Sequence, residues 1–311
     1  MRFVQLATLL SLAAISAVAA DKQILLIAGA PSHPPGQHEH NAGVLLMTKW
    51  LGTVKGVHAT PFLSAAWPDN AQLEKADAIF VFSDGEGSHP VFKAPERIAA
   101  MQKAADRGAG IMFFHYATEP PKDVVNKQML DWIGGFFEVN YSVNPHWDAK
   151  FESLPKHPIT SGVKPFTIRD EWYYNIRFAE GTKNFTPILS ATPPRDSVNE
   201  TDGPRNGNAD VRSKRGQPHV VAWAIERPNK GRGVGWTGGH HHKNWSDENF
   251  RKLALNALLW VAKADIPREG VQTTVTEAEM SENLDPKPAR RSPAVVKPAG
   301  AGSNPAEAPK P

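Results

Sequence analysis

The chain has 311 residues, of which 41% are hydrophobic, and a formal net charge of +3 at pH 7. This length suffices for one large domain or two small ones. Because there is no cysteine, disulfides, thiol nucleophiles and thiolate metal ligands are excluded. Lysine and arginine form no basic stripe interleaved with aromatic residues, so we expect no nucleic-acid partner.

Residues 1–20 have the pattern of a secretory signal peptide. Arg2 precedes an apolar stretch, and Val18 and Ala20 are the small residues expected before a cleavage site. The stretch is too short and too rich in alanine for a membrane anchor, and no later segment is long and apolar enough to span a bilayer. We therefore expect a periplasmic or secreted protein that begins at Asp21 and has no stable membrane span.

Short apolar runs alternate with amphipathic stretches along the chain. The runs predict strands at 24–28, 57–61, 78–82, 110–114, 219–225 and 233–237. The amphipathic stretches predict helices at 39–51, 95–107, 122–133 and 247–262. This alternation favours an α/β fold with a mostly parallel sheet that is covered on both faces.

Two segments lack the pattern of a buried core. Residues 195–216 are polar and contain proline, glycine and asparagine, which predicts a long surface loop. From about Asp265 onward, prolines are spread among alanine, lysine, glutamate and serine, a composition that cannot bury a core. We therefore expect one folded domain over 21–264 and a disordered tail over 265–311.

His115 ends the apolar run at 110–114. Ligands of open α/β sheets bind at the carboxyl ends of the strands, so His115 is placed where a nucleophile or base is expected. The alternative is a core histidine that is hydrogen-bonded to backbone, and the sequence favours neither interpretation.

Other histidines follow the first and last expected strands. Strand alternation would place His240 and His242 on one face, which is a familiar geometry for metal ligands. His33 and His38 follow the first strand, so a parallel sheet would bring them to the same edge. These four residues are the predicted ligands of a divalent metal such as zinc. The alternative is that the histidines cap loops and hydrogen-bond one another.

Two adjacent acids precede two aromatic residues at 170–173. Paired acids suit general acid/base chemistry on a sugar, but neighbours on a strand point to opposite faces, so only one acid would face the site. We take Glu171 as that acid. Aromatic rings stack on sugars, although most simply pack in a core. The predicted substrate-binding residues are Asp84, Glu86, Trp172, Tyr173 and Trp245.

Several motifs occur in one order over residues 22–263, and together they resemble the ThuA-like (trehalose utilisation) family. The motifs are Ser32-His33, residues 36–41, Phe114-His115, residues 157–162, residues 170–173, and residues 238–240 with Asn244-Trp245. The resemblance implies a flavodoxin-like three-layer sandwich of the class I glutamine amidotransferase-like type, and a role in sugar metabolism. Those amidotransferases carry a cysteine where His115 stands here, so thiol-based amide hydrolysis is excluded for this chain.

Two hypotheses of different classes follow. The first is an exported enzyme that cleaves a glycosidic bond in a sugar or a 3-keto-glycoside, as a hydrolase or lyase, with assistance from a metal. His115 would be base or metal ligand, Glu171 acid/base, and His240 a ligand or oxyanion stabiliser. The second is a non-catalytic carbohydrate-binding protein with structural histidines. The partner in both is a small carbohydrate.

Overall fold

The computed structural model describes residues 21–122, 126–181 and 184–287. The expected signal peptide (1–20) and the last part of the expected tail (288–311) therefore lie outside the described residues. Among the described helices, none has the length and apolar character needed to cross a membrane.

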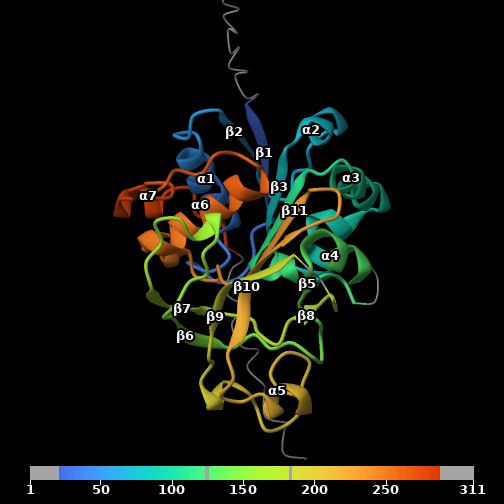
Figure 1. The fold of residues 1–311 in the computed structure, drawn as a ribbon, viewed down its shortest axis with the longest axis vertical. Helices are drawn as coiled ribbons and strands as arrows, with labels where there is room; N and C mark the ends of the chain where they lie inside the picture. Colours follow the sequence, from blue (N-terminus) through green and yellow to red (C-terminus); the bar gives the residue numbers. More distant parts are fainter. Residues whose placement is uncertain (1–20, 123–125, 182–183, 288–311) are drawn as a thin grey trace, which may run out of the picture.

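A seven-stranded sheet forms the centre of the molecule (Figure 1). Its strands are β1 (Lys22–Ala28), β2 (Val57–Phe62), β3 (Ala78–Phe82), β4 (Gly110–Phe114), β9 (Phe185–Ala191), β10 (His219–Glu226) and β11 (Arg232–Trp236). They are ordered β2-β1-β3-β4-β11-β10-β9, and β10 alone runs in the direction opposite to the other six strands. The first five strands in this order have the arrangement of flavodoxin-like sheets, which confirms the predicted fold class.

Helices cover both faces of the sheet. The covering helices are α1 (His40–Leu51), α2 (Asn70–Lys75), α3 (Pro95–Asp106), α4 (Asn126–Ile133) and α6 (Glu248–Val261), and the described helices also include the short α5 (Ala209–Ser213) and α7 (Glu277–Ser281). Because side chains alternate along a strand, Ile24 and Leu26 of β1 pack with α1 and α6. Leu25 and Ile27 pack with α2, α3 and α4 on the other face. Burial on both faces explains why the strands read as continuous apolar runs.

The predicted helices at 39–51, 95–107 and 247–262 are α1, α3 and α6, to within one residue at each end. The helix predicted at 122–133 is α4, of which the described part begins at residue 126. Gly110 allows α6 to approach β4 closely, because a Cβ there would lie 2.2 Å from the carbonyl oxygen of Val261. The core is thus tightly packed behind the strand that ends at the site.

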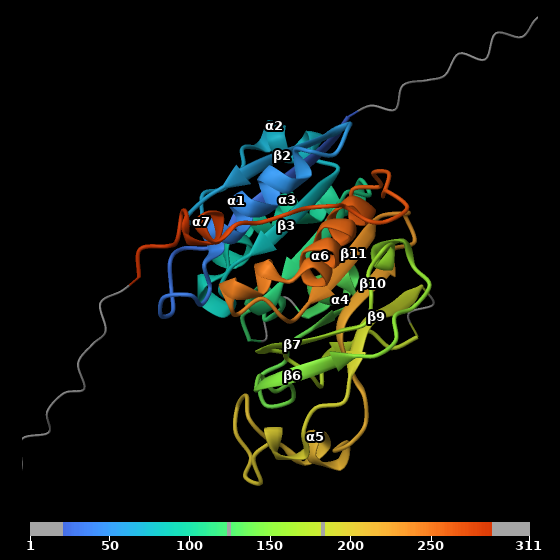
Figure 2. The same ribbon diagram turned by 90° about the vertical axis from the view of Figure 1, so that its left-hand side faces the viewer.

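Within the described residues, four short strands lie outside the central sheet. They form two antiparallel pairs, β5 (Gly135–Phe136) with β8 (Arg177–Phe178), and β6 (His146–Phe151) with β7 (Phe166–Glu171). The β6–β7 hairpin carries Glu171 to the carboxyl edge of the sheet. The predicted loop at 195–216 contains the short helix α5, which projects away from the sheet at the bottom of both views (Figures 1 and 2).

The chain beyond residue 264 remains ordered as far as residue 287, which differs from the expectation of a disordered tail from residue 265. Val271 is buried, and its backbone N–H donates to Asn256 of α6. The Thr274 carbonyl accepts from the Trp50 indole, which ties the segment to α1. The proline-rich composition concealed this order because the segment packs in an extended path against helices that lie far away in sequence.

Candidate functional site

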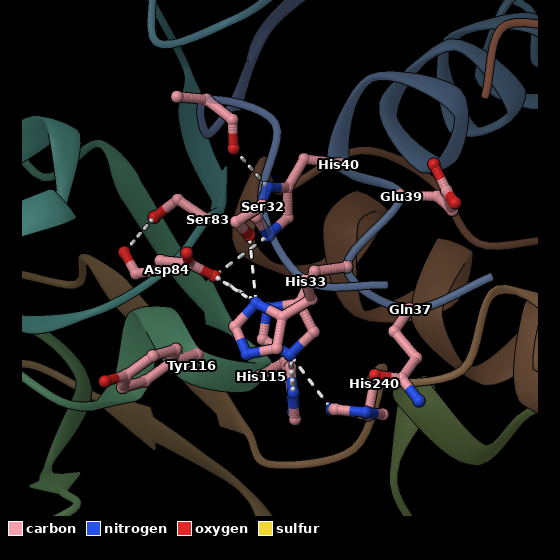
Figure 3. Close-up of polar contacts among 12 residues, drawn as sticks. Ser32, His33, Gln37, Glu39, His40, Ser83, Asp84, His115, Tyr116 and His240 are labelled. Atoms are coloured by element: carbon pink, nitrogen blue, oxygen red, sulfur yellow. Dashed lines mark hydrogen bonds and ion pairs between the residues drawn. The ribbon is translucent and has the colours of Figure 1, made fainter. Parts of the chain in front are cut away.

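Histidines and acids from distant parts of the chain meet at the carboxyl edge of the sheet. Parallel strands end at one edge, so the loops after β1, β3, β4 and β11 bring His38, Asp84, His115 and His240 together. Figure 3 shows the imidazoles of His115 and His240 pointing toward the same place, with Asp84 on the other side of the His33 ring. Glu171 reaches the same place from the end of β7.

Four of these side chains offer ligand atoms within 4.8 Å of one another: His38, His115, Glu171 and His240. His38 Nε2 lies 2.9 Å from His240 Nδ1 and 3.1 Å from His115 Nε2. Glu171 Oε2 lies 3.0 Å from His240 Nδ1 and 3.5 Å from His115 Nε2. Ligands about 2.1 Å from a tetrahedral zinc ion are separated from one another by about 3.4 Å, so this buried group could hold a metal ion.

Hydrogen bonds on the far side of two rings fix their orientation. His115 Nδ1 donates to the Thr237 carbonyl oxygen at 2.8 Å, and His38 Nδ1 donates to the Asp84 carboxylate at 2.6 Å. In the neutral tautomers that result, the two Nε2 atoms carry lone pairs that face each other across 3.1 Å. A cation between them would satisfy both lone pairs, and an outer partner on the second ring nitrogen is typical of metal-binding histidines.

Burial keeps these imidazoles neutral. It lowers the pKa of His115 well below the ordinary value of 6.5, and the neighbouring His38 and His240 act in the same direction. Burial likewise lowers the pKa of His38 well below its ordinary value. A neutral imidazole is the form that binds a metal, so both side chains are ready to act as ligands at neutral pH.

Three histidines of this region adopt a left-handed backbone conformation. The φ angles are 57° at His33, 45° at His38 and 56° at His115. His115 follows β4 directly, at the turn into a 3-10 helix. This conformation costs a residue with a Cβ about 1–2 kcal/mol, and such strain gathers at functional sites.

Asp170 and Glu171 have different surroundings. Asp170 is fully buried and accepts hydrogen bonds from the backbone N–H groups of Gly239 (2.6 Å), His240 (3.0 Å) and His241 (3.3 Å). Burial raises the pKa of Asp170, while the hydrogen bond from the Gly239 N–H acts in the opposite direction. The Glu171 side chain is 12% exposed and contacts the imidazoles. Asp170 therefore holds the loop, and Glu171 is available for chemistry.

Tyr173 joins the cluster of imidazoles through its hydroxyl group. The oxygen lies 3.3 Å from His115 Nε2 and 3.4 Å from Glu171 Oε2. Burial raises the pKa of Tyr173 well above its ordinary value, so the phenol keeps its proton. It can therefore donate a hydrogen bond to the Glu171 carboxylate.

Two residues predicted to stack on sugar lie in the core instead. Trp172 is fully buried and its indole donates to the Ile168 carbonyl oxygen. Trp245 is also buried and stacks on Phe114 with ring centroids 5.6 Å apart. Neither ring is accessible to a ligand, because both pack within the core against Phe250 of α6.

His242 does not join the cluster, which corrects its prediction as a metal ligand. Its Nε2 lies 3.1 Å from the Met280 carbonyl oxygen. Strand alternation fails here because β11 ends at Trp236 and the chain turns at Gly239, where φ is +116°. His240 and His242 therefore point to different places.

His33 and Glu86 lie beside the cluster. His33 stacks on His38 with ring centroids 3.5 Å apart, and its Nδ1 lies 3.6 Å from Asp84 Oδ1. Glu86 forms an ion pair with Arg205 at 2.9 Å and accepts from the Tyr116 hydroxyl. Both residues therefore lie next to the group of four ligand residues, but neither belongs to it.

Three residues that contact the cluster were not predicted from the sequence. Asn144 donates to Glu171 Oε1 at 3.0 Å, and His146 Nε2 lies 3.9 Å from the same oxygen. Thr237 supplies the carbonyl oxygen that orients His115. A sequence signal for the strand that carries His146 was present, because polar and apolar residues alternate along β6 in the same way as exposure and burial do. The many aromatic residues of this stretch obscured that alternation. His146 is 39% exposed, so a ligand would reach Glu171 from this side.

Comparisons with known proteins agree with this architecture. A family model described as ThuA, trehalose utilisation, matches residues 32–261. A search of curated proteins finds no match. The crystal structure of a putative ThuA-like protein from Bacteroides uniformis aligns with a TM-score of 0.55 at 16% identity, covering 80% of this chain and 95% of that one.

A glutamine amidotransferase from Methylobacillus flagellatus aligns with a TM-score of 0.39 at 10% identity, covering 86% of this chain and 88% of that one. The family match spans well over half of the sequence and includes the loops that carry His38, His115, Glu171 and His240. The chain therefore belongs to the ThuA family, which is implicated in trehalose utilisation.

Proposed function

We propose that His38, His115, Glu171 and His240 bind a divalent metal ion, zinc or similar, and that the protein cleaves a glycosidic bond in a sugar or 3-keto-glycoside. The convergence of four ligand atoms within 4.8 Å is the observation that carries this proposal. Membership in a sugar-utilisation family supports the class of substrate. The pattern of residues 1–20 supports action outside the cytoplasm, in the periplasm or in secreted form.

A metal explains the cluster better than a hydrogen-bond network does. The Nδ1–H groups of His115 and His38 donate to the Thr237 carbonyl oxygen and to the Asp84 carboxylate. Each neutral ring carries one proton, so neither ring has a second proton to place between the two Nε2 atoms. Three imidazoles and one carboxylate are a ligand set that suits zinc. A divalent cation bound there would have to accept a substrate carbonyl oxygen as a fifth ligand, and it would then polarise that oxygen and stabilise the negative charge that develops on it.

Glu171 is the residue best placed to move a proton. Its Oε1 atom is not the oxygen that contacts His115 and His240; it accepts from Asn144 and lies 3.9 Å from the exposed His146. Tyr173 lies within reach of the other oxygen and can hold the carboxylate in place. A carboxylate with one oxygen at the cluster and one toward solvent can act as a general base on a bound sugar.

A 3-keto-glycoside makes the chemistry accessible to these groups. Glu171 takes the proton from C2, and the C2–H electron pair forms the C1=C2 double bond as the C1–O bond to the aglycone breaks. The same carboxyl group returns the proton to the aglycone oxygen, which leaves as an alcohol. Water that adds across the double bond would complete a net hydrolysis. The carbonyl at C3 acidifies the C2–H bond, and this is why the keto form is the favoured substrate.

The non-catalytic alternative is the weaker of the two hypotheses. It depends on aromatic rings that stack on a sugar, and Trp172 and Trp245 are buried in the core.

The test is release of an aglycone from glycosides and from their 3-keto forms, with and without a chelator. We expect release from the keto form, loss of release with chelator, and recovery when zinc is added. His115→Ala should lower turnover at least about 100-fold, because it removes a ligand and opens the cluster. The matched control is His58→Ala, which changes an exposed histidine paired with Asp21 at the opposite edge of the sheet.

Full release by His115→Ala, or release that is insensitive to chelator, would contradict the proposal. Sugar binding without any product would instead favour the carbohydrate-binding alternative. Circular dichroism of each variant would confirm that the fold is retained.

A further inference from the structure

We propose that Asp285 and Lys287 are positioning residues that hold the loop after β1 so that His38 can enter the metal site. Residues 283–287, which we call the C-terminal strap, lie beyond the region matched by the family model. This inference rests on the proposed function, since it assigns His38 as a ligand. It gives a role at the site to part of the chain whose composition suggests a disordered tail.

Lys287 binds the loop through four oxygen atoms. Its Nζ lies 3.1 Å from Glu39 Oε2, and it donates to the carbonyl oxygens of Ser32 (3.1 Å), Gln37 (2.8 Å) and His38 (3.3 Å). The Lys287 side chain is only 8% exposed. A buried ammonium group is costly unless it is fully paired, so the loop carbonyls must stay in place for Lys287 to remain buried.

Asp285 caps the helix that follows the loop. Its carboxylate accepts from the backbone N–H groups of His40 (2.8 Å) and Asn41 (3.3 Å), at the start of α1. The N-cap residue of α1 is Glu39, and its side chain makes no capping hydrogen bond. The first N–H groups of a helix need acceptors and favour negative charge, so Asp285 supplies from 245 positions away what the local sequence lacks.

Glu39 completes a reciprocal clamp. Its Oε2 accepts from the backbone N–H of Asp285 at 2.7 Å, and its Oε1 accepts from Gly36 N–H at 2.7 Å. In Figure 3 the Glu39 carboxylate points away from His115 and His240. The strap therefore grips the outer side of the loop while His38 faces the cluster.

His38 requires such support because of its backbone. It has φ of 45°, a left-handed conformation that is unfavourable for a residue with a Cβ and persists only when its surroundings impose it. The strap binds the carbonyl oxygens of His38 and of Gln37 before it, and binds the side chain of Glu39 after it. Without these bonds the loop would relax, and His38 would leave its position 3.1 Å from His115.

The strap does not touch the four ligand atoms, so its effect must pass through the loop. Removing Lys287 should therefore change the geometry and affinity of the metal site while leaving the other ligands intact. Loss of a partner that orients a ligand typically costs about 10- to 100-fold in metal affinity.

The test uses the whole chain loaded with Co²⁺, whose visible absorption reports ligand number and geometry. Lys287→Met and Asp285→Ala should weaken Co²⁺ binding about 10- to 100-fold and alter the spectrum. Asp285→Asn retains an oxygen that can cap α1, so it should recover most of the affinity lost in Asp285→Ala. The matched control is Lys55→Met, an exposed lysine at the opposite edge of the sheet, which should bind as wild type does.

A second measurement is independent of metal. Hydrogen exchange of the backbone amides at 32–41 should be faster in Lys287→Met than in wild type or Lys55→Met. Unchanged Co²⁺ affinity and spectrum in Lys287→Met would overturn the proposal. If wild type bound no Co²⁺, the proposed metal site would be wrong. Equal exchange rates in wild type and Lys287→Met would then also contradict the claim that the C-terminal strap holds the loop.

Discussion

Asp170 accepts a hydrogen bond of 3.0 Å from the backbone N–H of His240, although 70 positions separate the two residues. The bond joins the end of β7 to the loop after β11. Because Glu171 is the next residue after Asp170, the same contact sets the distance between the Glu171 carboxylate and the His240 imidazole. One buried carboxylate thereby aligns two of the four proposed ligands.

The first prediction is that Asp170→Asn destabilises the protein and weakens metal binding. An amide can present only one oxygen to the N–H groups of Gly239, His240 and His241, and its own N–H₂ group would face a donor. Loss of charge-assisted hydrogen bonds in a buried position should lower the free energy of unfolding by about 2–3 kcal/mol. Urea unfolding measures the first effect, and zinc competition titration measures the second.

The control for this variant is Asp148→Asn, on the neighbouring strand of the hairpin. Asp148 is exposed and pairs with Arg169, and such surface pairs contribute at most about 1 kcal/mol. Equal stability of the two variants would contradict the role given to Asp170.

The second prediction concerns the turn at Gly239. Its φ of +116° is unfavourable for any residue with a Cβ, and an added Cβ would lie 2.3 Å from Phe114 Cε1. Gly239→Ala should therefore displace His240, lower the melting temperature by several degrees and reduce metal affinity. Calorimetry and metal titration check both effects. In Gly87→Ala the added Cβ meets no atom within 4 Å, so this control should behave as wild type.

The third prediction is that Tyr173→Phe lowers turnover about 10-fold with little change in stability. The substitution removes only the hydroxyl group that reaches Glu171 and His115, and the ring still fills its place in the core. Steady-state kinetics on the 3-keto substrate provide the measurement. In the control Tyr174→Phe, the lost hydroxyl contacts Ser197, away from the cluster. A turnover loss shared equally by both variants would count against a role for Tyr173 at the site.

The fourth prediction is that stability falls as the pH drops from about 6.5 toward about 3. Burial lowers the pKa of His89 from 6.5 to about 3. Across this pH range His89 therefore binds a proton in the unfolded chain but not in the native protein. Each such proton lowers the free energy of unfolding by about 1.4 kcal/mol per pH unit. Urea unfolding at pH 7, 6, 5 and 4 gives the slope.

His89→Gln isolates this contribution, because glutamine can still donate to the Ala117 carbonyl and accept from Val91 N–H. We expect the slope of unfolding free energy against pH to be smaller in this variant, by the amount that corresponds to about one proton. His58→Gln, which changes an exposed imidazole, is the control. Identical slopes in His89→Gln and wild type would exclude His89 as a source of the acid sensitivity.

Much of the fold could be predicted because its signals are local. The strands β1, β3 and β4 are short apolar runs, and α1, α3 and α6 carry apolar stripes at helical spacing. The parallel sheet then placed the loops with His38, Asp84 and His115 at one edge. His240 follows β11 at the same edge, whereas Glu171 comes from the β6–β7 hairpin outside the central sheet, so its place beside His240 does not follow from the topology of that sheet.

The remaining features depend on contacts that no local pattern encodes. An exposed and a buried tryptophan look alike in sequence, so nothing distinguished Trp172 and Trp245 as core residues. The alternation of side chains along a strand did not apply to His242, because β11 ends at Trp236. Asp285 and Lys287 bind residues about 250 positions earlier, within a segment whose composition resembles a disordered linker.

The central claim is that a divalent cation binds between His38, His115, Glu171 and His240. The most direct test is anomalous diffraction at the zinc absorption edge from crystals of the protein soaked in zinc. The account predicts one strong peak about 2.0–2.2 Å from His38 Nε2, His115 Nε2, His240 Nδ1 and Glu171 Oε2. A fully refined crystal structure with no anomalous peak among these four atoms, at saturating zinc and neutral pH, would contradict it.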